Sequence, residues 1–159
     1  MAYYRVDKNI YLSSLQLKDV NQLVELLKDK EIHKNILEIP FPYTQEDGKN
    51  FVNICKKNTR KYGVIINWAI RDHNKKLIGV CSFHKKYSSR SKKDEIGYWL
   101  GRTYWNKGIM TIVVKKLCEI GFNKFNLKEL KHKYSPTTLL HAKCLKKSDS
   151  SSKEHYVNR

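Results

Sequence analysis

The segment Asp94–Thr111, with the sequence DEIGYWLGRTYWNKGIMT, restricts the fold more than any other part of the chain. It predicts a strand over Glu95–Leu100, a polar turn over Gly101–Lys107 and a helix that begins at Gly108. A glycine-containing turn that enters a helix directs several unpaired backbone N–H groups, and the positive end of the helix dipole, at one point. The segment therefore predicts a binding site for an anion such as phosphate.

Composition indicates a globular protein without an obvious redox or metal motif. The 159 residues are 40% hydrophobic and 11% aromatic, enough to form the core of one domain. The sequence contains no apolar run of transmembrane length and no apolar leader at its start, so we expect no membrane association and a cytoplasmic location. The four cysteines form no CxxC pair and the six histidines do not cluster, so we expect no metal.

The net charge of +17 favours anionic partners, including nucleic acid and phosphorylated small molecules. Lysine supplies 26 of the 32 positive charges, however, and the lysines are scattered along the chain. Sites that bind phosphates or base edges usually contain more arginine. A lysine-rich, solvated surface is therefore the favoured explanation of the charge, and charge alone does not define a function.

Hydrophobic periodicity and turn residues predict a mixed α+β domain whose central twisted sheet is mostly antiparallel and flanked by helices. Asp19 is the expected N-cap of the first helix, and Thr44 with Asp47 forms the pattern of a capping box. Before the central segment, we expect a strand over Ile10–Leu17, helices over 19–29, Glu31–Leu37 and 44–61, a hairpin of Val64–Arg71 with Leu77–His84, and a polar loop over Lys85–Lys93. After it, we expect the Gly108 helix to end near Lys124, a strand over Leu127–Tyr134, and a last helix from Pro136 that contains Leu139, Leu140, Ala142, Cys144 and Leu145.

The segment Glu95–Thr111 closely resembles the strand, pyrophosphate loop and helix start of the GNAT superfamily of N-acetyltransferases. The branch that it resembles most is that of the ribosomal-protein N-terminal acetyltransferases. Supporting matches are the helix opened by Asp19, WAI at Trp68–Ile70 and LIGV at Leu77–Val80. The resemblance covers about residues 8–147, so we expect a GNAT-like domain over 8–147 and a polar tail over 148–159.

The resemblance implies that acetyl-CoA is the co-substrate and assigns residues to it. The end of the strand, at Leu100, Gly101 and Arg102, is expected to bind the pantetheine arm through main-chain groups. Thr111 adds a hydroxyl at the helix start, and Arg102 and Lys107 can add positive charge. The loop that wraps the pyrophosphate with its backbone amides corresponds to Trp105, Asn106, Lys107, Gly108, Ile109 and Met110.

Two loop residues depart from the family pattern. Asn106 stands where glycine is common, and asparagine tolerates the left-handed backbone conformation better than most residues. Met110 replaces a small residue, and its flexible side chain can fit into the core.

The implied reaction is direct attack of an amine on the thioester, for which a general base is useful. Glu95 is the candidate base by its position on the strand; the alternative is a surface carboxylate that balances Lys92 and Lys93. Tyr134 and His141 are weaker candidates for protonating the leaving group. Thr138, His141 and Lys146 differ from the Asn, Ser and Glu usual in the family's last helix.

The C-terminus also differs from the family pattern, because relatives continue with a final pair of strands on the acceptor side. Here KEHYV at Lys153–Val157 resembles the start of the last of those strands, so the domain is expected to be shortened. The leading hypothesis is an acetyl-CoA-dependent N-acetyltransferase acting on a primary amine of a protein N-terminus or a small molecule. The alternatives are a GNAT-like domain with impaired CoA binding and catalysis, and a basic nucleic-acid-binding module. The acceptor and the oligomeric state stay open.

Overall fold

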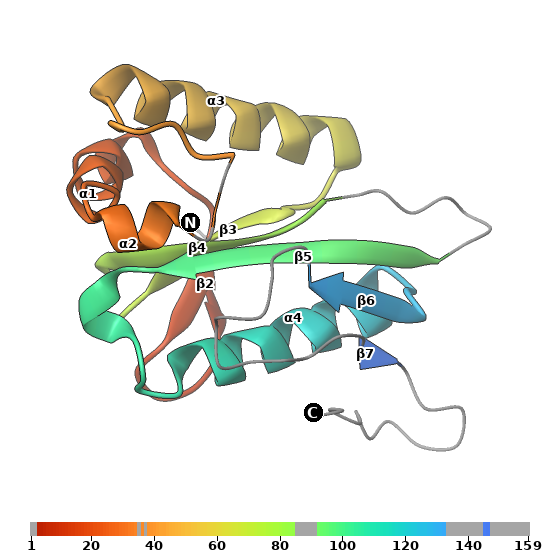
Figure 1. Cartoon of the computed structure of the whole chain (residues 1–159). Helices are drawn as coiled ribbons and strands as arrows, with labels where there is room; N and C mark the ends of the chain where they lie inside the picture. The colour runs from red at the N-terminus through yellow and green to blue at the C-terminus, as the bar shows by residue number, and fades with distance from the viewer. Residues whose placement is uncertain (1–2, 35, 37, 85–91, 133–144, 147–159) are drawn as a thin grey trace. The chain divides into compact units, whose positions relative to one another are not determined.

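The computed structural model describes residues 3–34, 36, 38–84, 92–132 and 145–146. These residues belong to two compact units, which are described separately. The first unit comprises Met1–Ser82 and Tyr98–Ile109, and the second comprises Phe83–Gly97 and Met110–Arg159. Strand β5 (Lys93–Leu100) therefore contributes its beginning to the second unit and its end to the first (Figure 1).

The first unit contains four consecutive antiparallel strands. They are β1 (Tyr3–Arg5), β2 (Tyr11–Ser13), β3 (Asn67–Arg71) and β4 (Leu77–Phe83). Each pairs with the next, as when Leu12 of β2 lies opposite Ile70 of β3. Both residues are fully buried, because β-branched and aliphatic side chains form the inner face of these strands.

The described part of this unit also contains a short 3-10 helix and three α-helices. The short helix η1 (Leu17–Asp19) leads into α1 (Val20–Leu26), which is followed by α2 (Lys30–His33) and α3 (Gln45–Tyr62). Helix α3 begins with the predicted capping box, in which Thr44 accepts a hydrogen bond from the Asp47 amide and Asp47 accepts one from the Thr44 amide.

Helix α3 runs unbroken through Gly48, although a glycine inside a helix lowers its stability. A Cβ atom at Gly48 would lie 2.8 Å from Cγ1 of Val20 on α1. The glycine therefore allows the two helices, which lie side by side in Figure 1, to approach closely.

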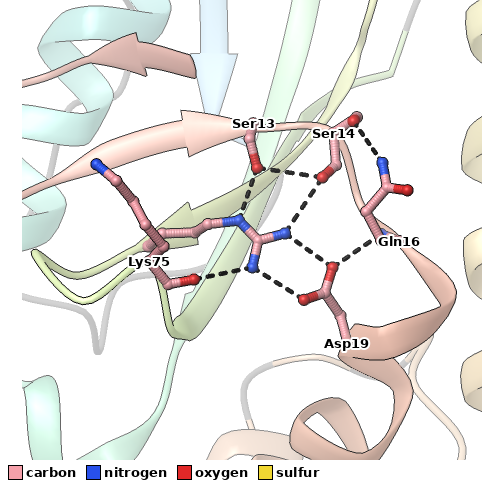
Figure 2. A network of polar contacts seen from close by, with 6 residues as sticks. Ser13, Ser14, Gln16, Asp19 and Lys75 are labelled. Carbon is pink, nitrogen blue, oxygen red and sulfur yellow. Dashed lines mark hydrogen bonds and ion pairs between the residues drawn. The ribbon is translucent and has the colours of Figure 1, made fainter. Parts of the chain in front are cut away.

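A buried ion pair connects the strands of the first unit to the start of α1. Arg71 is 2% exposed, and its Nη1 and Nη2 atoms donate to the two carboxylate oxygens of Asp19 at 2.9 and 2.8 Å. Arg71 also donates to Oγ of Ser13 and to the backbone carbonyls of Ser14 and Lys75, so all five guanidinium N–H groups have acceptors. Figure 2 shows this network.

Asp19 occupies the predicted N-cap position of α1, but its side chain makes no capping hydrogen bond to that helix. The carboxylate instead accepts the backbone amide of Gln16 at 2.8 Å and binds Arg71. A buried carboxylate requires a charged partner more than a helix requires a cap, which explains the difference.

The second unit combines a parallel and an antiparallel strand pair with one long helix. The beginning of β5 pairs in parallel with β6 (Glu129–His132), and β6 pairs antiparallel with β7 (Leu145–Lys146). Helix α4 (Ile109–Lys124) buries residues such as Val113, Leu117 and Phe122. A Cβ atom at Gly121 would lie 2.9 Å from Leu130, so this glycine allows α4 to pack closely on β6.

The structure confirms the predicted mixed α+β fold with mostly antiparallel pairing and corrects several details. Strand β1 was not predicted, β2 is shorter than the predicted strand, and Lys93 begins β5 instead of ending a loop. The last helix was predicted to include Leu145, which lies in strand β7, so that prediction is wrong for this residue. The rest of that helix, the KEHYV segment and most of the Lys85–Lys93 loop lie outside the described residues, and the proposed division at residue 147 stays a prediction.

Candidate cofactor site

The end of β5 is held against β4 by a close approach of the two backbones. A Cβ atom at Gly79 would lie 2.3 Å from the carbonyl oxygen of Trp99, closer than any side chain could be accommodated. Beyond it, the Gly101 amide donates to the carbonyl of Ile78 at 2.8 Å. These contacts fix the point at which the chain leaves the strand. Gly79 was not predicted to belong to this site, although a glycine inside an apolar strand is a signal for close backbone approach.

The loop after β5 folds back on the strand end. Helix η2 (Arg102–Tyr104) forms one tight turn, in which the Tyr104 amide donates to the carbonyl of Gly101 at 2.9 Å. The half-buried indole of Trp105 donates to the carbonyl of Leu100 at 2.9 Å. The Gly101 amide and the Leu100 carbonyl, which were predicted to contact pantetheine, therefore both have partners within the chain.

Two residues of the loop have left-handed backbone conformations. Asn106 has φ +60° and Gly108 has φ +73°, and both are exposed. Asparagine therefore adopts at this position the conformation that the sequence analysis expected it to tolerate. Apart from Gly108 and its two chain neighbours, no atom of the described residues lies within 4 Å of the position that a Cβ of Gly108 would occupy, so the space there is open.

The backbone amides that follow have no acceptor among the residues that the structure describes. Because α4 begins at Ile109, the amides of Ile109, Met110 and Thr111 precede the first intrahelical hydrogen bond. Across the part of the chain that the structure describes, no hydrogen bond uses the amides of residues 107–111. Unpaired amides at the positive end of a 16-residue helix, next to left-handed residues and open space, form a cradle that suits a diphosphate.

The two basic side chains of the loop differ in their surroundings. Nη1 of Arg102 lies 3.6 Å from Oδ2 of Asp29, at the turn between α1 and α2. Asp29 was not predicted to belong to this site, because it is far from Arg102 in the sequence and no local pattern connects the two residues. Nζ of Lys107 lies 5.9 Å from the ring centroid of Tyr104, and Lys107 has no ion pair with any acidic residue that the structure describes. Lys107 is therefore the more available of the two charges.

Glu95 lies on β5 in the second unit. Its carbonyl accepts the His84 amide at 2.9 Å, and its own amide donates to Oδ1 of the buried Asp94 at 2.7 Å. Its side chain is half-buried, and in the parallel pairing Glu95 lies opposite Lys131. Lys93, a predicted alternative partner of Glu95, has its ion pair with Glu129 at 3.1 Å.

The predicted residues therefore fall into two groups. Leu100, Gly101, Arg102, Trp105, Asn106, Lys107, Gly108 and Ile109 share the first unit, where the strand end and loop bring them together. Met110 and Thr111 continue α4, while Glu95 lies on β5. Tyr134, Thr138 and His141 lie outside the described residues, and of Lys146 only the strand assignment is described.

The described residues give little support for a reactive cysteine, a metal site or a membrane-spanning helix. Burial raises the pKa of the Cys55 thiol to about 12 and raises that of Cys81 further, so neither is a thiolate at neutral pH. In the ranges that the structure describes, no three His, Cys, Asp or Glu side chains gather as they would around a metal ion. None of the helices described there is long and apolar enough to cross a membrane.

The α+β fold and the amide-lined loop suit an anionic ligand such as a diphosphate, and comparison with known proteins identifies the family. Residues 9–149 match the acetyltransferase (GNAT) domain. The chain therefore belongs to this family of acetyl-CoA-dependent acetyltransferases. It is also similar to a curated relative, the uncharacterized N-acetyltransferase p20 of Bacillus licheniformis, with 26% identity over 133 residues that cover 81% of this chain and 71% of the relative.

Solved structures share the fold at low sequence identity. One is the Salmonella typhimurium acetyltransferase that modifies the N-terminal serine of the ribosomal protein L7/L12, with a TM-score of 0.70, 21% identity, and coverage of 87% of this chain and 78% of that one. Another is the microcin C7 self-immunity acetyltransferase MccE in complex with acetyl-CoA and AMP, with a TM-score of 0.64, 24% identity, and coverage of 80% and 70%.

Proposed function

We propose that this protein is an N-acetyltransferase that moves the acetyl group of acetyl-CoA to a primary amine, either a protein N-terminus or a small amine. Membership of the GNAT family supports the acetyl donor. The names of similar proteins support an amine acceptor, since one is an N-acetyltransferase and another modifies an N-terminal serine.

The observation that carries the proposal is the row of unpaired amides that follows Gly108. The diphosphate of acetyl-CoA needs several N–H donors and a backbone that bulky side chains do not cover. The loop offers both, since Gly108 is open and the amides of residues 107–111 have no other partner among the described residues. In this proposal Lys107 adds a positive charge, and the hydroxyl of Thr111 adds one more donor.

The strand end has a narrower role in this proposal than the family pattern implies. The Leu100 carbonyl already accepts the Trp105 indole, and the Gly101 amide already donates to Ile78. A carbonyl oxygen has two lone pairs, so Leu100 can still accept one hydrogen bond from pantetheine. Arg102 then serves mainly to hold the loop to Asp29.

We assign the role of general base to Glu95. In the reaction, the amine nitrogen forms a bond to the acetyl carbon, the carbon–sulfur bond breaks, and CoA leaves as the thiolate. An aliphatic amine is mostly protonated at neutral pH, so a carboxylate that accepts its proton, directly or through water, accelerates the attack. Backbone donors that face the developing oxyanion lower the barrier further.

Two measurements test this function. Titration calorimetry with acetyl-CoA measures binding, and a thiol-release assay with a panel of peptides and amines measures transfer. We expect binding, and thiol release that depends on an amine acceptor. Binding without release from any acceptor would support the alternative of a catalytically impaired domain, and folded protein that binds no acetyl-CoA would refute the proposed cofactor site.

A further inference from the structure

The exposed face of α3 carries positive charges that form no ion pair with the acidic residues that the structure describes. Helix α3 contains five basic residues, and the 21 residues between Lys49 and Arg71 include no aspartate or glutamate. Of the basic residues of α3, Lys56 is half-buried, and the exposed ones are Lys49, Lys57, Arg60 and Lys61. We call these four exposed residues, with Lys56 at their margin, the α3 basic face.

Some lysines outside α3 are paired locally, although Lys30 on α2 and Lys115 on α4 have no ion pair with a described acidic residue. Lys28 lies 2.8 Å from Glu25, Lys34 lies 2.6 Å from Glu31, and Lys116 lies 2.9 Å from Glu119, each three positions away along its helix or turn. In the described part of the chain, no residue of the α3 basic face has an acidic partner within 4.0 Å. The feature that sets this face apart is that its five basic residues lie together on one helix without a described acidic partner.

The helix dipole explains only part of this charge. Arg60 and Lys61 lie in the last turn of α3, where cations stabilise the negative end of the dipole. Lys49 and Lys57 lie further towards the N-terminus, where the dipole gives them no such benefit. From Lys49 to Lys61 the face extends about 18 Å along the helix axis, at 1.5 Å per residue.

The composition of the face favours a phosphate backbone over other anionic partners. Interfaces between proteins are usually depleted in lysine and have an apolar centre, whereas this part of α3 is rich in lysine and its exposed large apolar side chains are Ile54 and Tyr62, eight positions apart. Insertion into a membrane surface requires an apolar helix face, and the apolar face of α3 is buried through Val52 and Cys55. Lysine acts as a point charge that binds phosphate without reading sequence.

We propose that the α3 basic face binds the phosphate backbone of a nucleic-acid strand without sequence specificity. This binding is separate from the acetyl-CoA loop, and none of its residues takes part in the proposed reaction. In this proposal, the positive charge of α3 serves a second function in addition to acetyl transfer.

Fluorescence anisotropy with a labelled oligouridylate of about 12 nucleotides tests the proposal on the full chain. Five phosphate contacts predict a log–log slope of affinity against salt of about −3.5, since each contributes about −0.7 for a single strand. Replacing Lys57, Arg60 and Lys61 together by glutamine should make the slope about 2 less steep. The matched control replaces Lys18, Lys115 and Lys128, which are exposed on other parts of the chain, by glutamine and should leave the slope unchanged.

Circular dichroism and acetyl-CoA binding show whether each variant is folded. A second variant, Lys49→Gln with Lys56→Gln, repeats the test if the triple variant does not fold. Equal slopes for the face variant and its control would overturn the proposal, as would absence of binding at low salt. Polyglutamate or anionic lipid vesicles that bind as tightly as the oligonucleotide, with the same loss in the face variant, would overturn the assignment to nucleic acid.

Discussion

Gly108 and Gly63 form a matched pair that separates a structural role of the loop glycine from a binding role. Gly108 has φ +73° and Gly63 has φ +70°, and in the described part of the chain only their own chain neighbours come within 4 Å of either Cβ position. Gly63 ends α3 in the left-handed conformation, far along the chain from the proposed cofactor loop. Replacing either residue by tryptophan therefore introduces a similar backbone strain and no clash at the Cβ atom.

The loss of stability expected in both variants follows from the left-handed backbone conformation. A non-glycine residue in the left-handed region costs about 1–2 kcal/mol. For a chain of this length, that cost lowers Tm by about 2–8 °C, at about 2–4 °C per kcal/mol. We expect both Gly63→Trp and Gly108→Trp to remain folded and to lose a similar amount of stability.

The two variants should differ in cofactor binding. A tryptophan at Gly108 would cover the amides of residues 107–111, so we expect acetyl-CoA affinity to fall at least about tenfold, or about 1.4 kcal/mol. Gly63→Trp should bind acetyl-CoA like the unmodified protein. Differential scanning fluorimetry, with and without acetyl-CoA, and calorimetry measure both quantities. Unchanged affinity in Gly108→Trp, or equal losses in both variants, would refute the assignment of the phosphate loop.

Three further predictions concern other parts of the structure. Glu95→Gln should lower turnover with little change in acetyl-CoA affinity, and an unaltered pH–rate profile would count against its role as base. Asp19→Ala leaves the buried Arg71 without its carboxylate and should cost about 3–5 kcal/mol in chemical denaturation; a cost below about 1 kcal/mol, typical of an exposed pair, would contradict the buried network. Hydrogen bonds from the Thr44 backbone and side chain lower the pKa of Asp47, so their stabilisation is present above the ordinary carboxyl pKa and is lost as pH falls through the lowered one. Thr44→Ala should therefore destabilise the protein more at neutral pH than in strong acid, and equal effects at both would argue against the capping box.

Local patterns predicted the elements of the fold better than its long-range contacts. The capping box at Thr44 and the helix after Gly108 depend on residues a few positions apart, and the structure has both. The pairing of Asp19 with Arg71 joins residues 52 positions apart, and the sequence indicated only a helix cap. Likewise, periodicity could not show that Gly79 must be small because the Trp99 carbonyl lies against it.

The candidate site was predictable for the same reason, up to a limit. The strand, turn and helix start are contiguous, so the conformations of Asn106 and Gly108 could be expected from residue type. The contact between Arg102 and Asp29 could not be expected in this way, because it depends on the position of the α1–α2 turn. The roles of Glu95 and of the loop residues stay predictions that depend on the bound cofactor.

The most direct test of the central claim is an NMR titration of the ¹⁵N-labelled protein with acetyl-CoA. We predict that the amide resonances of Gly108, Ile109, Met110 and Thr111 shift most strongly, because their N–H groups acquire phosphate acceptors. Amides of the α3 basic face, such as that of Lys57, should shift little. Saturable binding that leaves the amides of residues 108–111 unchanged would contradict the proposal that this loop holds the diphosphate.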